Sequence, residues 1–152
     1  MTSINPSEAA RAVNRAIVMG GVKGRPDSAS EQNALVFVYG TLKSGQVNHH
    51  HLAGCRFCGE AQLPDLALHN LGPFPMAIAS NNPAATLQGE VYEVSSAKLH
   101  ELDRFEGAPR LYERQQHRLS DGRVVWVFVG RAHQVRHVPL ISSGRWSGCA
   151  AE

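Results

Sequence analysis

The chain has 152 residues, a hydrophobic fraction of 43% and a formal net charge of +2, which indicates one globular domain with a sizeable core. The charge is too small, and the arginines are too scattered, to favour binding to nucleic acid. No apolar run could span a membrane and the N-terminus lacks the hydrophobic core of a secretion signal, so we expect a cytoplasmic protein without membrane contact.

Residues 1–32 differ from the rest of the chain, and we expect an N-terminal helical arm followed by a linker. Asn5 suits a helix N-cap, Pro6 suits the first helical position, and Gly20 or Gly21 can end the helix. The stretch GVKGRPDSASEQN is typical of a linker. The arm is a candidate for docking, partner binding or oligomer assembly, and the alternative is a weakly ordered extension.

A domain over residues 33–152 follows, and it begins with a short buried strand. Residues 35–39, LVFVY, are apolar and rich in β-branched and aromatic side chains, which predicts a strand. Gly40 comes directly after it, and a glycine at the end of a strand permits a close approach to the backbone. Several backbone N–H groups of the following turn could then point at one anion.

The remaining elements are short strands around one clear helix. After a loop or helical turn over GQVNHHHLAG, we expect strands over residues 55–63 and 66–69, an extended segment LGPFPMAIAS, and a strand TLQGEVYEV. Two further strands, LYERQQHRL and RVVWVFVG, flank Ser120-Asp121-Gly122, a hairpin signal because Asp-Gly tolerates positive φ. This order predicts an α+β fold whose sheet can close into a small barrel.

The helix is predicted from SSAKLHELDRFEG, residues 95–107. Ser95 or Ser96 can cap its start and Gly107 can end it. Its spacing of large apolar side chains predicts a buried stripe formed by Leu99, Leu102 and Phe105.

Cysteine and histidine spacings do not support a metal or redox site. Cys55 and Cys58 form a C-x-x-C motif, but no second ligand pair stands at a zinc-site spacing, and a redox motif should open a helix. The adjacent residues His49–His51 cannot face one ion, so packing and hydrogen bonding near the first strand is the simpler role. We expect no metal, no cofactor and three reduced thiols, Cys149 included.

Glu106 is the acidic residue whose setting differs from the others. It stands at the predicted helix end, after Phe105 and before Gly107-Ala108-Pro109. A helix C-terminus disfavours a negative charge and an apolar neighbourhood does the same, so both would raise the pKa of this carboxyl. Proton transfer would explain such a carboxylate, and the alternative is a surface glutamate at a frayed helix end.

An ordered set of motifs now resembles the γ-glutamylcyclotransferase-like family, most closely the branch with γ-glutamylamine cyclotransferases. The set is VFVYGTLKSG, NHHHL, GEVYEV, LDRFEGAPRLYER, WVFV and ISSGRW, over residues 34–147. The resemblance implies a small mixed β-barrel with flanking helices and an anion-binding loop. It assigns Tyr39, Gly40, Thr41 and Leu42 to that loop. It also implies one essential glutamate, Glu106, and a pocket-lining tyrosine, Tyr112.

The resemblance further implies a cyclotransferase that releases 5-oxoproline and a free amine from a γ-glutamyl amine or γ-glutamyl amino acid. The N–H groups of Gly40, Thr41 and Leu42 would hold the substrate α-carboxylate, and Glu106 would act as general acid and base. Lys43 is a second candidate for attracting that carboxylate, although lysines are mostly exposed. Two alternatives are a non-catalytic member that binds a small molecule on the same loop, and a protein-interaction role centred on the arm.

Overall fold

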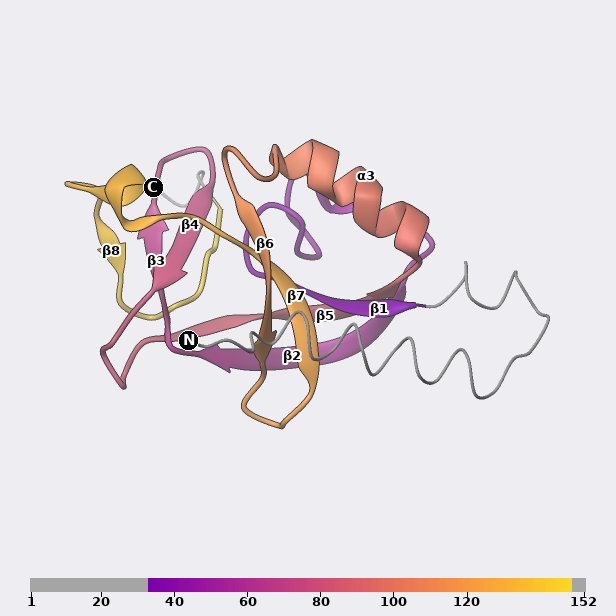
Figure 1. Ribbon diagram of the computed structural model, residues 1–152, viewed down its shortest axis with the longest axis horizontal. Helices are drawn as coiled ribbons and strands as arrows, with labels where there is room; N and C mark the ends of the chain where they lie inside the picture. Colours follow the sequence, from indigo (N-terminus) through magenta and orange to yellow (C-terminus); the bar gives the residue numbers. More distant parts are fainter. Residues whose placement is uncertain (1–32, 149–152) are drawn as a thin grey trace.

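The computed structural model describes residues 33–148, which form two β-sheets, one α-helix and two short 3-10 helices (Figure 1). The arm predicted over residues 1–32 lies outside the described residues. The five-stranded sheet has the order β2 (Arg56–Pro64), β5 (Thr86–Val94), β1 (Ala34–Val38), β7 (Val124–Val129) and β6 (Glu113–Arg118). The three-stranded sheet has the order β4 (Pro75–Ala79), β3 (Leu66–Asn70) and β8 (Leu140–Ile141), and the helices are α3 (Ser96–Glu106), η1 (His49–Leu52) and η2 (Ala132–Val135).

Strand β1 lies in the middle of the five-stranded sheet and is covered on both faces. Phe37 and Tyr39 point into one apolar core, whereas Val36 and Val38 point into the other. The strand runs antiparallel to β5 and parallel to β7, with Val36 in register with Trp126. Burial on both faces explains why the sequence is continuously apolar here rather than alternating.

Helix α3 begins and ends as predicted, but its apolar stripe is shorter. The Ser95 hydroxyl accepts a hydrogen bond of 3.0 Å from the Lys98 N–H, and Gly107 adopts a left-handed conformation at the C-terminus. Leu99 and Leu102 are buried. The prediction that Phe105 is buried was wrong: it is 37% exposed, because the last helical turn borders a cavity instead of the sheet.

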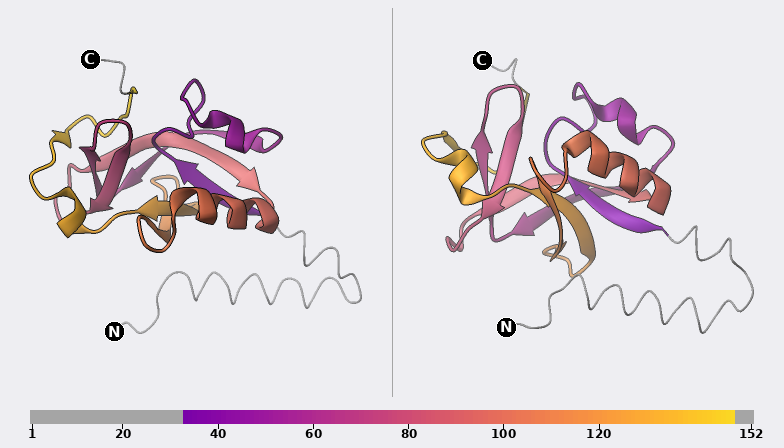
Figure 2. Two further views of the ribbon diagram at one scale, coloured as in Figure 1. Left: turned by 90° about the horizontal axis from the view of Figure 1, so that it is seen from above. Right: turned by 45° about the horizontal axis from the view of Figure 1, so that its top comes forward.

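The α+β class is confirmed, whereas no closed barrel is found within residues 33–148. The two edge strands β2 and β6 do not form a ladder. A backbone hydrogen bond of 3.0 Å from Ser120 to Gln62 bridges the sheet edges at the β6–β7 turn. Figure 2 shows the three-stranded sheet at one end of the five-stranded sheet, joined where the Gly130 N–H donates to Ala77 O at 2.8 Å.

Two short elements were not predicted from the sequence. β8 has two residues and η2 has four, and neither is long enough to show a hydrophobic period. Among the described residues, no helix has the length and apolar character needed to cross a membrane. The cytoplasmic location remains a prediction.

Candidate active site

A cavity of about 340 Å³ opens beyond the C-terminal end of β1, beside the last turn of α3. Its lining includes all six residues that the sequence analysis assigned to a site: Tyr39, Gly40, Thr41, Leu42, Glu106 and Tyr112. The wall also contains nine apolar residues, which are Phe37, Val38, Val47, Pro73, Phe74, Pro75, Phe105, Leu111 and Phe128. The structure thus brings two segments that are far apart in the sequence to one apolar, concave surface.

Glu106 is the carboxylate of this cavity. It is the last residue of α3, directly before the left-handed Gly107, and its side chain is only partly exposed. Burial raises the pKa of Glu106 from 4.5 to about 7, and within the described residues no donor or cation offsets this effect. Near neutral pH the carboxyl is therefore present in both protonation states, which suits a group that accepts and returns a proton.

The turn after β1 is held in place through its carbonyl and hydroxyl groups. The Asn48 backbone N–H donates to Thr41 O at 2.9 Å, its side-chain amide donates to the Thr41 hydroxyl at 3.1 Å, and His49 Nδ1 donates to Leu42 O at 2.9 Å. Within residues 33–148, the N–H groups of Gly40, Thr41 and Leu42 donate none of the hydrogen bonds recorded for this turn. The binding of an anion by these three N–H groups remains a prediction.

Asn48 and His49 were not predicted as site residues, although the run NHHH follows the turn closely in the sequence. His49 fixes the turn, and the neighbouring His51 ring lies 4.2 Å from the Phe105 ring. These contacts confirm packing and hydrogen bonding as the role of the histidine run. Among the described residues, no group of three or more metal-ligating side chains could hold an ion.

Gly40 permits a close approach, as the sequence predicted, and the approaching group is Pro75. A Cβ atom at position 40 would lie 2.8 Å from Pro75 Cγ and 2.9 Å from Pro75 Cδ. Such distances are too short for any side chain, so the packing of the two sheets requires a glycine here.

The two tyrosines of the cavity have their hydroxyl groups already bound. Tyr112 donates to Pro75 O at 2.7 Å, and Tyr39 donates to Phe128 O at 2.7 Å while accepting from the Ala77 N–H at 3.1 Å. Burial raises the pKa of both phenols well above the usual value, so both are neutral. They fix the cavity walls and do not present a free acid.

We expect Tyr112→Phe to cost stability more than activity. The substitution leaves the buried Pro75 carbonyl without its partner, which should lower the free energy of unfolding by about 1–2 kcal/mol. Urea unfolding measures this change, and Tyr92→Phe is the matched control, because the Tyr92 hydroxyl contacts the Glu90 carboxylate outside the cavity. A variant of unchanged stability that had lost its activity would instead assign the Tyr112 hydroxyl to the chemistry.

Lys43 does not take part in the cavity, and the prediction of an exposed lysine was also wrong. Its side chain is 8% exposed, and Nζ donates to Trp146 O at 2.7 Å. Burial lowers the pKa of Lys43. Lys43 is buried because the C-terminal segment covers it. A hydrogen bond of 2.8 Å from the Gln88 N–H to Gly144 O holds this segment beside β5. Lys43 anchors that segment instead of attracting a ligand.

Residues 36–148 match the family model for γ-glutamyl cyclotransferase, AIG2-like. The chain belongs to this γ-glutamylcyclotransferase family. The γ-glutamylcyclotransferase family protein ytfP of Citrobacter rodentium is 34% identical over 111 residues, which are 73% of this chain and 93% of that protein. The γ-glutamylaminecyclotransferase of Bos taurus is 41% identical over 98 residues, covering 58% of this chain and 57% of that protein.

Solved structures agree with this assignment. The crystal structure of an AIG2-like protein from Mus musculus superimposes with a TM-score of 0.61 at 27% identity, covering 72% of this chain and 86% of that one. Sequence and fold therefore both support an enzyme of this family.

Proposed function

We propose that this protein releases 5-oxoproline and a free amine from γ-glutamyl amines or γ-glutamyl amino acids, with Glu106 as general acid and base. The observation that supports the proposal most is the shared cavity, in which Glu106 and the turn Gly40–Leu42 both contribute to the wall. Tyr39 and Tyr112 shape that wall. The protonation behaviour of Glu106 supports the acid and base role.

In the proposed reaction the α-amine of the substrate attacks the γ-carbonyl carbon of the same molecule. The N–H groups of Gly40, Thr41 and Leu42 hold the α-carboxylate, so that the α-amine faces the γ-carbonyl carbon of the same molecule. Glu106 takes a proton from the α-ammonium, and the freed amine forms a C–N bond with the γ-carbon. Glu106 then gives this proton to the leaving nitrogen and takes the second surplus proton from the attacking nitrogen. The bond from the γ-carbon to the leaving amine breaks, which yields the neutral lactam and a free amine, and Glu106 releases the second proton to that amine or to solvent.

The lining of the cavity favours a leaving amine without a carboxylate. Apart from Glu106 and the two neutral tyrosines, the part of the lining that the structure describes has no ionisable side chain. Its outer residues are exposed and apolar, with Val47 at 74%, Leu111 at 43% and Phe105 at 37%. A carboxylate on the leaving group would lie near Glu106 without a cation, which is costly in a partly desolvated site.

The proposal is tested with a matched pair of substrates. γ-Glutamyl-isobutylamide and γ-glutamyl-valine share the same carbon branch in the leaving group and differ by one carboxylate. We expect both to release 5-oxoproline, with kcat/KM about tenfold or more higher for the isobutylamide. The Nα-acetylated isobutylamide, whose α-nitrogen cannot attack, is the negative control. Binding of both substrates without 5-oxoproline would favour the non-catalytic alternative.

A further inference from the structure

The segment between Glu106 and Tyr112 borders the cavity, yet its second half has little burial of its own. Pro109, Arg110 and Leu111 are all exposed. Leu111 nevertheless lines the cavity, and the segment begins at the residue that follows Glu106. Ala108 packs against the apolar core, but the exposed residues after it need polar contacts if they are to keep a fixed position.

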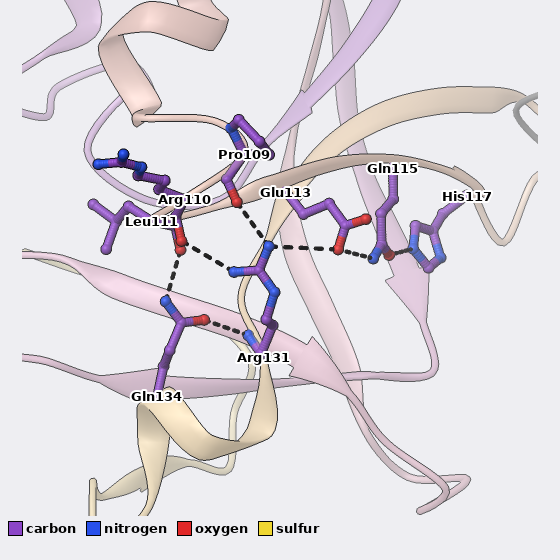
Figure 3. A network of polar contacts seen from close by, with 8 residues as sticks. All are labelled: Pro109, Arg110, Leu111, Glu113, Gln115, His117, Arg131 and Gln134. Atoms are coloured by element: carbon purple, nitrogen blue, oxygen red, sulfur yellow. Dashed lines mark hydrogen bonds and ion pairs between the residues drawn. The ribbon is translucent and has the colours of Figure 1, made fainter.

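The Ala108 N–H donates to Asp103 O and the Leu111 N–H donates to Gly107 O, both at 2.9 Å, and the other contacts come from the loop after β7. Arg131 donates from Nη2 to Pro109 O at 2.7 Å and from Nη1 to Arg110 O at 3.0 Å (Figure 3). Gln134 donates from Nε2 to Leu111 O at 2.9 Å. Three consecutive carbonyls of the turn are therefore bound by two side chains from a different part of the chain.

The two side chains are themselves fixed to the sheet. The Arg131 N–H donates to Gln134 Oε1 at 2.6 Å (Figure 3). The Gln134 N–H donates to Arg131 O at 2.9 Å. Arg131 follows Gly130, whose N–H is bound to Ala77 of β4, and the short helix η2 buries Val135. Arg131 and Gln134, which we call the carbonyl brace, thus connect the turn to a rigid part of the fold.

We propose that the carbonyl brace is a positioning device that holds Glu106 in place within the cavity. The inference rests on the proposed function for its catalytic consequence, but the position of Glu106 can be measured without turnover. A planar guanidinium can donate to two neighbouring carbonyls at once, whereas a lysine ammonium lacks that fixed fork. The arginine itself, and not only its charge, is therefore required.

The test compares Arg131→Ala and Arg131→Lys with the wild type. Burial is what raises the pKa of Glu106 to about 7, so a loosened turn should admit water and move this pKa towards 4.5. The titration is followed by NMR of 13C-carboxyl-labelled glutamate, with Glu106→Gln used to assign the signal. We also expect kcat to fall about tenfold or more, with a smaller change in KM, for both variants.

Arg123→Ala is the matched control. Arg123 has a similar exposed side-chain fraction, 36% against 38% for Arg131, and it binds Asp121 at the other end of the β6–β7 hairpin. We expect the pKa of Glu106 and the kcat of this variant to match those of the wild type. If Arg131→Ala fails to fold, the same titration is carried out on Gln134→Ala, which removes one of the three carbonyl contacts. Its result then decides whether the carbonyl brace positions Glu106.

The outcomes separate the two proposals. A folded Arg131→Ala protein in which Glu106 titrates as in the wild type would overturn the positioning role, and so would full recovery in Arg131→Lys. A wild type without 5-oxoproline release contradicts the proposed function, while the NMR titration still decides whether the brace positions Glu106.

Discussion

Replacing Glu106 with glutamine is expected to lower kcat/KM for γ-glutamyl-isobutylamide by at least about a hundredfold. Glutamine keeps the shape of the side chain but cannot accept the proton of the α-ammonium, and this loss is typical of removing a general base. In the wild type, kcat/KM should fall as the pH drops below about 7, because Glu106 then becomes protonated. 5-Oxoproline release measures both effects.

The same substitution should make the protein more stable at high pH. The pKa of Glu106 is raised from 4.5 to about 7 on folding, so between these pH values the folded state holds more protons than the unfolded state. Stability due to this group therefore falls as the pH rises through that window and is level above it. Glu106→Gln removes the penalty, which amounts to up to about 3 kcal/mol at pH 8.

Urea unfolding at pH 4.5 and pH 8 checks this prediction, with Glu101→Gln as the control. Glu101 lies on the same helix but is exposed and paired with Lys98 at 2.8 Å, so its loss should change stability only slightly and leave the activity intact. Equal turnover by Glu106→Gln and the wild type would exclude Glu106 from the mechanism. A variant that gained no stability at pH 8 would show that the carboxylate is well solvated.

Gly40→Ala is expected to lower both stability and activity, because the new methyl group collides with Pro75. The Cβ atom would lie 2.8 Å from a ring carbon of Pro75, and a proline ring cannot rotate away. Overpacking of this kind costs about 1–3 kcal/mol, and the turn Gly40–Leu42 must shift away from the cavity wall. Since that turn holds the substrate carboxylate in the proposed mechanism, we expect KM to rise.

A double-mutant cycle with Pro75→Ala tests the cause. The smaller side chain makes room for the methyl group, while the Pro75 backbone carbonyl that binds Tyr112 is kept. We expect the double variant to lose less stability than the sum of the two single losses. Strict additivity would mean that the Pro75 contact is not the reason for the glycine.

Much of the fold was predictable because its signals are local. The apolar run of β1 and the Ser95 and Gly107 caps of α3 each act within a few residues. β8 and η2 carry no such signal. β8 forms where the chain pairs with β3, and η2 forms where it contacts the loop of residues 107–112. The domain boundary at residue 33 and the role of the arm over residues 1–32 remain predictions.

The errors at individual side chains have a common cause. Phe105 has the right helical spacing for burial but meets a cavity, and Lys43 is covered by the C-terminal segment. Arg131 carries no motif, and its contacts join the loop after β7 to the turn after α3. Burial and hydrogen bonding across such distances depend on how the sheets pack, which single-sequence patterns do not contain.

The sequence by itself therefore determined the kinds and order of the longer elements, the family resemblance and the place of Glu106 at a helix end. Only the tertiary structure decided that Glu106, Tyr112 and the turn Gly40–Leu42 border the same cavity, and that the tyrosine hydroxyls are bound within its walls. Local patterns reflect interactions between residues close together in the sequence. The shape, charge and desolvation of a cavity arise instead from packing between segments that are far apart in the sequence.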